Sequence, residues 1–403
     1  MRTERLKHVA TIRVSNVDKK SADDELPVRL CNYTDVYYNE RITSDLDFMA
    51  ATATRVQHMA FGLQVGDVVL TKDSETADDI GVSALIAEDV PDLVCGYHLA
   101  IVRPRAEATY GPYLRWVLAS DAARQAMSMA ATGVTRFGLR SEAIADLAVP
   151  MRSLEEQREI VDYLDRETAR IDALIVAKRD QVSRLEERVD ALVQEAIDRS
   201  RPDSLPLRRL VAAFVDYRGA TPEKSSSGVP LITATNVKNG RINLALGEQF
   251  VTDETYTLWM RRGFPAVGDV LITTEAPLGE VAAITDAHVA LAQRIILLKP
   301  NRDRVVPGFL RVSLLSSRVQ ADLLSRASGS TVWGIRADRL RDVMVPLPGP
   351  AEQQRVVEIA RDAEQASLVT RRLINRQVQL LTERRQALIT AAVTGRLDVP
   401  VAA

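Results

Sequence analysis

The chain has 403 residues, a formal net charge of −2 and 46% hydrophobic residues. This length predicts two to three domains, and the apolar content is sufficient for well-formed cores. The near-neutral charge excludes a protein that binds nucleic acid through overall basicity, so contact with DNA would need local patches or a partner. We see neither an apolar run that spans a bilayer nor an N-terminal signal core, so we expect a cytoplasmic chain with no membrane contact.

Residues 1–150 mix short strand-like segments with one helical segment, which is typical of an α+β module. The first 25 residues are polar and predict a lead-in or an edge strand. Strands are predicted within residues 27–36, 61–71 and 99–102, and a loop is predicted at 72–79. The segment 113–130 predicts one helix, because Leu114, Val117 and Leu118 share a face.

Residues 151–200 contain a predicted long helix, which has neither glycine nor proline between Leu154 and Arg199. Apolar residues recur there in two interleaved series seven residues apart, as in a coiled coil. The first series is Val161, Thr168, Ile175, Val182, Val189 and Ala196, and the second is Leu164, Ile171, Lys178, Leu185 and Leu192. Two interpretations of Lys178 are open. It either fixes the register between the two helices, or its aliphatic chain lies along a loosely packed part of the seam with the ammonium group in solvent. A helix about 70 Å long needs a partner for this seam.

Residues 201–206 predict a linker, because they include Pro202 and Pro206, and residues 207–350 then repeat the plan of the first module. Asn239-Gly240 predicts a hairpin turn. The other predicted elements are strands at 229–234, 268–273 and 295–298 and a helix at 307–324. The module is again α+β.

Residues 351–396 predict a second long helix, followed by a tail at 397–403. Its apolar seam runs through Ile374, Val378, Leu381 and Leu388, and is weaker where Glu364, Ser367 and Arg371 fall on core positions. Thr394-Gly395 predicts the helix end. Shifting the chain by 196 residues places Glu156-Gln157 on Glu352-Gln353 and residues 132–140 on 328–336. We therefore predict two tandem modules, each followed by a long helix, with the helices packed as an antiparallel coiled coil.

No catalytic motif is evident in the sequence. The histidines His8, His58, His98 and His288 are scattered, and Cys31 and Cys95 lack metal-ligand spacing, so we expect reduced thiols. Asp67 and Asp269 each follow a glycine before a strand, which favours turn residues over nuclease carboxylates. A binding protein is favoured over an enzyme.

The order of module, helix, module and helix resembles the specificity subunit of type I restriction-modification systems. Three phrases carry this resemblance: residues 345–353 (VPLPGPAEQ), residues 384–395 (RRQALITAAVTG), and the loop and strand with Gly219, Thr221-Pro222 and Pro230-Leu231-Ile232. The first module departs from the family pattern, because residues 31–36 (CNYTDV) replace the glycine and threonine-proline loop.

The resemblance implies that each module is a target recognition domain for one part of a split, asymmetric site in double-stranded DNA. Two modification subunits would dock on the chain and carry S-adenosylmethionine and adenine methylation. Restriction subunits would supply translocation and cleavage driven by ATP and Mg²⁺. The chain itself would be noncatalytic and without a cofactor. A stiff helical spacer would hold the two half-sites at a fixed distance, about one DNA turn or ~34 Å.

The candidate DNA contacts are polar side chains in loops beside strands, because Arg pairs with guanine and Asn or Gln with adenine. In the first module they are Asn32, Tyr33, Thr71, Lys72, Tyr97, His98, Thr135 and Arg136. In the second they are Tyr217, Arg218, Thr221, Lys224, Thr235, Asn236, Thr274, Gln293, Arg294, Ser330 and Thr331. For each residue the alternative is a phosphate contact or ordinary loop polarity. Phe137 and Trp333 occupy matched positions and are predicted to be core side chains.

Two other functions are compatible with the sequence. The chain could be a coiled-coil scaffold whose two modules bind ligands without specificity for DNA sequence. It could also be an enzyme with an unrecognised site. A gel-shift assay with the modification partner separates the first of these from a DNA reader, and turnover by the chain alone tests the second.

Overall fold

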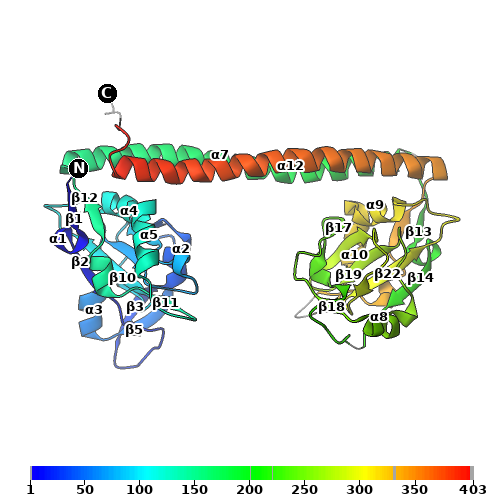
Figure 1. Ribbon diagram of the computed structural model, residues 1–403, viewed down its shortest axis with the longest axis horizontal. Helices are drawn as coiled ribbons and strands as arrows, with labels where there is room; N and C mark the ends of the chain where they lie inside the picture. The colour runs from blue at the N-terminus through cyan, green and yellow to red at the C-terminus, as the bar shows by residue number, and fades with distance from the viewer. Residues whose placement is uncertain (1, 200, 220, 330–332, 400–403) are drawn as a thin grey trace. The chain divides into compact units, whose positions relative to one another are not determined.

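The computed structural model describes residues 2–199, 201–219, 221–329 and 333–399 (Figure 1). The chain forms two compact units, Met1–Arg179 with Asn375–Ala403 and Asp180–Ile374. Two long helices, α7 (Leu154–Asp198) and α12 (Pro350–Val393), each contribute to both units. The predicted α+β fold, with two modules that are each followed by a long helix, is confirmed.

The first module is built on a mainly antiparallel five-stranded sheet in the order β2-β10-β6-β8-β4. Its strands are β2 (Ala10–Val14), β4 (Arg41–Ile42), β6 (Val68–Thr71), β8 (Ser83–Ile86) and β10 (Leu99–Pro104). A second sheet contains β5 (Met49–Ala53), β3 (Leu26–Cys31) and β9 (Leu93–Cys95), in that order. Two small sheets pair β1 (Thr3–Arg5) with β12 (Ala148–Pro150) and β7 (Asp73–Ser74) with β11 (Phe137–Gly138).

Short helices connect these strands. They are α1 (Leu6–Val9), α2 (Tyr33–Tyr38), α3 (Arg55–Phe61), η1 (Ala77–Asp79), α4 (Gly111–Ala119), α5 (Asp121–Ala130) and α6 (Ser141–Ala145). The polar segment predicted as the end of a strand is helix α2, because Asn32 and Asp35 form a capping box at its start. The single helix predicted at 113–130 is wrong. It is broken at Ser120, which has extended backbone and whose hydroxyl donates to the Val117 carbonyl (2.6 Å).

The second module has a four-stranded antiparallel sheet in the order β14-β22-β19-β20. Its strands are β14 (Val211–Asp216), β19 (Val270–Thr274), β20 (Leu278–Ala283) and β22 (Ile295–Pro300). Smaller sheets contain β18 (Phe250–Val251), β15 (Val229–Ile232) and β21 (Ala290–Leu291), and the pair β16 (Val237–Lys238) and β17 (Arg241–Ile242). Asn239 and Gly240 have positive φ angles of 51° and 76°, as the predicted hairpin requires.

The helices of the second module follow the plan of the first. They are η2 (Leu207–Arg209), η3 (Ala234–Asn236), α8 (Asp253–Trp259), η4 (Met260–Arg262), α9 (Phe309–Leu315), α10 (Ser317–Ser325) and α11 (Ala337–Leu340). The helix predicted at 307–324 is also broken, at Ser316, for the reason given for Ser120. The predicted linker is wrong in part, because β13 (Ser204–Pro206) pairs with β23 (Met344–Pro346) as β1 pairs with β12.

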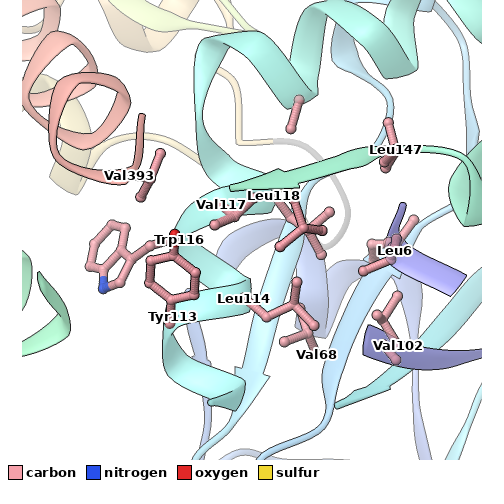
Figure 2. Close-up of a cluster of buried hydrophobic side chains, with 14 of the residues drawn as sticks. Leu6, Val68, Val102, Tyr113, Leu114, Trp116, Val117, Leu118, Leu147 and Val393 are labelled. Atoms are coloured by element: carbon pink, nitrogen blue, oxygen red, sulfur yellow. The ribbon is translucent and has the colours of Figure 1, made fainter. Parts of the chain in front are cut away.

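Both long helices enter the core of each unit. In the first unit, Leu164 of α7 and Val393 of α12 belong to the same buried cluster as Trp116 of α4. Figure 2 shows Val393 and Trp116 around this cluster. In the second unit, Ile197 of α7 and Val356 of α12 join the core of that module. Each module is therefore anchored on the helices by apolar packing.

The helices run antiparallel within each unit. In the first unit, Arg385 of α12 bonds to Asp172 of α7 (2.9 Å). In the second unit, Arg371 of α12 bonds to Glu186 of α7 (2.8 Å). Together with the apolar pairs above, these contacts show that higher numbers on α7 face lower numbers on α12. The prediction of antiparallel helices is confirmed within each unit.

The predicted seam is accurate at the start of α7 and drifts at its end. Val161, Leu164 and Ile171 are buried, whereas Leu192 is 38% exposed and the neighbouring Val193 is 5% exposed. An α-helix has about 3.6 residues per turn, so a strict seven-residue series leaves the buried face after several turns. Lys178 is half-buried.

The internal duplication extends to buried hydrogen bonds. Gln157 and Gln353 occupy matched positions at the starts of α7 and α12, and both side chains are buried. The partners of Gln157 are the amide of Tyr110 (2.7 Å), the hydroxyl of Thr109 (3.3 Å) and the carbonyls of Ala108 (3.2 Å) and Arg152 (3.0 Å). Those of Gln353 are the amide of Val306 (2.9 Å) and the carbonyls of Arg304 (3.0 Å) and Pro348 (2.9 Å). In both halves of the chain, a buried glutamine thus joins the start of the long helix to its module by hydrogen bonds.

Candidate nucleic-acid interface

Three chain segments of the first module meet where β6 ends and β10 begins. The Lys72 amide donates to the His98 carbonyl (3.0 Å), and the Leu139 amide donates to the Lys72 carbonyl (2.8 Å). These bonds extend the antiparallel pairing of Leu99 with Thr71. They place the polar residues that follow β6 beside those that precede β10.

A charged cluster occupies this end of the sheet. The Asp73 carboxylate bonds to Nζ of Lys72 (2.8 Å) and to Nδ1 of His98 (2.8 Å). Burial raises the pKa of Asp73, but the hydrogen bonds from Lys72 and His98 outweigh it and hold the pKa below its usual range. The Arg136 guanidinium lies 3.4 Å from both ring nitrogens of His98. One carboxylate therefore binds Lys72 and His98, and Arg136 contacts His98.

Aromatic side chains flank this cluster. The Tyr97 ring lies 3.7 Å from the His98 ring, and Tyr33 stacks on Tyr37 with 5.4 Å between centroids. The Tyr37 hydroxyl donates to Asp79 (2.7 Å). Of the predicted contacts in this module, Tyr33, Lys72, Tyr97, His98 and Arg136 gather here. Asn32 caps the start of α2, and Thr135 is exposed. The Asn32 amide oxygen lies 3.8 Å from the position that a Cβ atom would occupy if Gly96 carried one.

The second module has a matching arrangement where β19 ends and β22 begins. The Thr274 amide donates to the Arg294 carbonyl (2.9 Å), and the Ile335 amide donates to the Thr274 carbonyl (2.9 Å). Glu275 stands where the first module has Asp73, and its carboxylate lies 3.1 Å from Nε of Arg294. An acid and a nitrogen donor thus occupy the same place in both modules.

The position of Trp333 corrects a prediction. The side chain is 62% exposed, although its match, Phe137, is partly buried against the core of the first module. Gly334, the next residue, is bridged to Glu275 in the backbone. Trp333 therefore exposes a large apolar surface, and the prediction that it belongs to the core is wrong.

Burial corrects the prediction for four candidates. Thr71, Tyr217, Asn236 and Thr274 are at most 3% exposed. Their side chains bond within the fold. Thr71 accepts from the Val82 amide, Tyr217 donates to the Gly263 carbonyl, Asn236 donates to the Asn243 and Leu246 carbonyls, and Thr274 donates to the Arg294 carbonyl. Their side chains support loops of the fold.

Among the other candidates of the second module, Arg218 lies close enough to Glu275 for their charges to interact. Arg218 forms an ion pair with Asp216 (2.6 Å), and the Thr221 hydroxyl lies 3.5 Å from the amide oxygen of Gln293. Lys224 and Thr235 are exposed. Ser330 and Thr331 lie outside the described residues. Within the described ranges, neither Lys224 nor Thr235 bonds to Glu275 or Arg294.

The acidic members of the two clusters, Asp73 and Glu275, were not among the predicted contacts. A search for residues that read bases favours donors and amides, so it overlooks carboxylates that orient those donors. The signal that could have found them is the alignment of the two halves, because both carboxylates follow the strand that begins at Gly66-Asp67 or Gly268-Asp269.

Over the ranges that the structure describes, no group of three or more His, Cys, Asp and Glu side chains could hold a metal ion. Asp67 is paired with Arg103 (2.6 Å) and Asp269 with Lys299 (2.7 Å), and each carboxylate also accepts a turn amide. This supports the interpretation of Asp67 and Asp269 as turn residues. Cys31 and Cys95 are free and buried.

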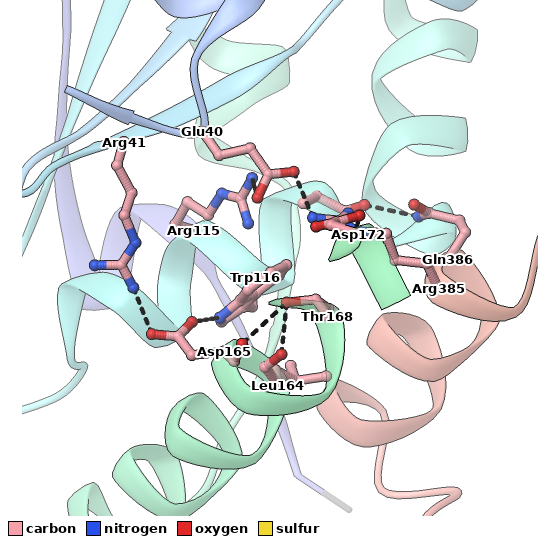
Figure 3. Close-up of polar contacts among 11 residues, drawn as sticks. Glu40, Arg41, Arg115, Trp116, Leu164, Asp165, Thr168, Asp172, Arg385 and Gln386 are labelled. Atoms are coloured by element: carbon pink, nitrogen blue, oxygen red, sulfur yellow. Dashed lines mark hydrogen bonds and ion pairs between the residues drawn. The ribbon is translucent and has the colours of Figure 1, made fainter. Parts of the chain in front are cut away.

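Polar contacts join the first module to the helices of its unit (Figure 3). The Glu40 carboxylate accepts from Arg115 of α4 (2.9 Å) and from Arg385 of α12 (2.7 Å). Burial raises the pKa of Glu40, but the two guanidinium groups outweigh it and lower the pKa below its usual range. Nε1 of Trp116 donates to Asp165 of α7 (3.0 Å). The module is thereby fixed to both helices by polar contacts as well as apolar ones.

Comparison with known proteins gives related sequences and a related fold. No family model matches the chain. The MjaIX specificity subunit of a type I restriction enzyme from Methanocaldococcus jannaschii is 29% identical over 147 residues, which are 35% of this chain and 33% of that protein. The EcoBI specificity subunit of Escherichia coli is 20% identical over 298 residues, 66% of this chain and 62% of that protein. The aligned parts thus cover less than two thirds of either relative.

One solved structure has the same fold over almost the whole chain. It comes from work on complex assembly and conformational transition of the type I R-M system, with a TM-score of 0.70, 17% identity and 98% coverage of both chains. The fold is therefore that of tandem α+β modules on two long helices. The predicted resemblance to type I specificity subunits is confirmed by these comparisons.

In the described parts of the chain, none of the helices is both long and apolar enough to cross a membrane.

Proposed function

We propose that this chain is the DNA-reading specificity subunit of a type I restriction-modification complex. Each module would be a target recognition domain, and the two would read the unlike halves of a split site in double-stranded DNA. The observation that carries this proposal is the matched cluster at the end of the sheet in each module. The hydrogen bonds that shape the two clusters are the same, whereas the exposed side chains differ, as two readers of different sequences require.

In this proposal the chain acts in the cytoplasm and has no catalytic role. Methyl transfer from S-adenosylmethionine would belong to two modification subunits, and cleavage driven by ATP and Mg²⁺ to restriction subunits. The absence of a recognisable catalytic motif in the sequence agrees with this division of work. The relatives named above, which are specificity subunits, support it further.

The test is to produce the chain with its modification subunits in a host that lacks other methylation, and to sequence the methylated genome. We expect a motif of two different half-sites separated by a fixed number of unspecified base pairs. The same host without this chain is the control, and it should lack the methylated motif. Methylation without sequence preference, or none with all subunits present, would favour a scaffold that does not read DNA.

A further inference from the structure

The duplication within the chain separates side chains that support the fold from side chains that have diverged. The backbone bonds between residues 72 and 98 and between residues 274 and 294 are equivalent and differ by 0.1 Å in length. On this common framework the first module carries Lys72 and His98, and the second carries Thr274 and Arg294. A position where the framework is kept and the donor changes is where two related modules can acquire different base preferences.

Arg294 has the geometry of a guanine reader. Its side chain is 51% exposed, and its Nε lies 3.1 Å from the Glu275 carboxylate. This ion pair holds the guanidinium group beside Glu275 and leaves its terminal NH₂ groups to bond elsewhere. Among the described residues no further bond from the Arg294 side chain is found. A planar pair of donors is complementary to O6 and N7 of guanine in the major groove.

The first module holds its donors more deeply. The side chains of Lys72, Asp73 and His98 are 17–20% exposed, and the Arg136 guanidinium lies 3.4 Å from both ring nitrogens of His98. The carboxylate is retained, but it is shared between two donors. This centre therefore presents different groups from the same place in the fold, so it should favour a different base.

Resting on the proposed function, we propose that Glu275 and Arg294 form the base-reading centre of the second module, with Arg294 bound to a guanine in one half-site. In the first module Lys72 and His98, held by Asp73, occupy the same place and read the other half-site. Glu275 and Asp73 are positioning residues, because they orient the donors and do not themselves contact the base.

The experiment uses the full complex with modification subunits and maps methylated sites across a genome. Arg294→Ala should reduce discrimination at one guanine of one half-site by about 5- to 150-fold. Arg294→Lys should retain the guanine, and Arg294→Gln should move the preference toward adenine. Arg302→Ala is the matched control. Arg302 lies beyond the opposite end of β22, so its loss should leave the motif unchanged.

Glu275→Gln distinguishes positioning from bulk charge. The substitution removes a negative charge near DNA, so affinity for unrelated DNA should stay the same or rise. Discrimination at the guanine read by Arg294 should nevertheless fall, because the neutral amide holds the guanidinium group less firmly. Unchanged discrimination would contradict the positioning role.

His98→Ala should alter the half-site that Arg294→Ala leaves intact. If the unmodified complex methylates a split site and all of these variants keep its motif, the base-reading centre is wrong while the proposed function stands. Changes by both variants in the same half would overturn the assignment of one centre to each half. Should Arg294→Ala fail to fold, Arg294→Lys and Arg294→Gln still decide the matter. The proposed function is contradicted only if the complex with the original chain, without any substitution, methylates no specific DNA motif.

Discussion

Single buried polar residues fix each module to its long helix. Gln353 is 1% exposed, and its side-chain amide makes all of its hydrogen bonds to backbone groups of the second module and of the helix entry. Its removal would leave a buried amide and buried carbonyls without partners, a larger loss than the net energy of the bonds themselves. Gln353 thus holds a loop of the second module against the start of α12.

Gln353→Ala should destabilise the protein by about 2–3 kcal/mol, because several buried backbone groups lose their partner. Gln354→Ala is a matched control one residue further along α12. Gln354 is exposed, and among the described residues its side chain bonds only to Glu358 (3.1 Å), so its loss should change stability by less than about 0.5 kcal/mol. Denaturant unfolding measures both variants. Equal effects would show that the buried network does not stabilise the second unit.

Glu40 should make the stability of the first unit depend on pH. Its pKa is lowered in the folded state by Arg115 and Arg385 against the opposing effect of burial. Stability from such a group is present above the pKa of the unfolded chain, about 4.3, and is lost as the pH falls through the folded value. Glu40→Gln should therefore lower the melting temperature near pH 7 and reduce its fall between about pH 5 and pH 3. A parallel pH profile for the variant and the original chain would contradict this.

At the scale of elements, the attachment of a long helix to its module depends on which face of the helix is buried. Leu164 of α7 is fully buried in the core of the first unit, whereas Leu174 on the same helix is 46% exposed. The helix surface is charged elsewhere, so the apolar face supplies most of the packing that keeps α7 on its module.

Leu164→Ala should destabilise the first unit by about 3 kcal/mol, because it leaves a cavity against α12 and the module. Leu174→Ala, which removes the same atoms from an exposed site, should change stability by less than about 1 kcal/mol. Thermal unfolding followed by circular dichroism measures the difference. Similar losses for both would mean that Leu164 does not lie in a packed core.

The sequence predicted the elements whose pattern is long and repeated. The seam of α7 is recognisable because several turns carry the same spacing, and the two halves of the chain support each other at Gln157 and Gln353. The breaks at Ser120 and Ser316 were missed because serine is tolerated inside helices, and only its bond to the preceding turn reveals the end. The exposure of Trp333 depends on where a loop crosses the sheet end, which residue type alone does not determine.

At the scale of the whole molecule, each unit contains part of α7 and part of α12. Each module therefore packs on segments of both long helices. In the proposed function, the length of the two long helices would set the number of base pairs between the half-sites. Helix rise is about 1.5 Å per residue, and DNA advances about 34 Å per turn, so helix length and gap length are linked.

Inserting matched heptads into both helices tests this link. The insertions go between Arg179 and Asp180 and between Ile374 and Asn375, the boundaries of the two units, so each unit keeps its own contacts. Three heptads add about 32 Å, or roughly nine base pairs, which is close to one DNA turn. Both modules could then still face the same side of the duplex. Two heptads add about 21 Å, or roughly six base pairs. At that gap, one half-site lies on the other side of the duplex from the module that should read it.

We expect the chain with three added heptads to methylate the same two half-sites with a gap about nine base pairs longer. The chain with two added heptads should lose methylation, although each module should still bind its own half-site in isolation. Genome-wide mapping of methylated sites measures the gap. An insertion into α7 alone is the control, because it disrupts the antiparallel pairing without lengthening both helices. An unchanged gap in either paired insertion would show that the helices do not set the distance between half-sites.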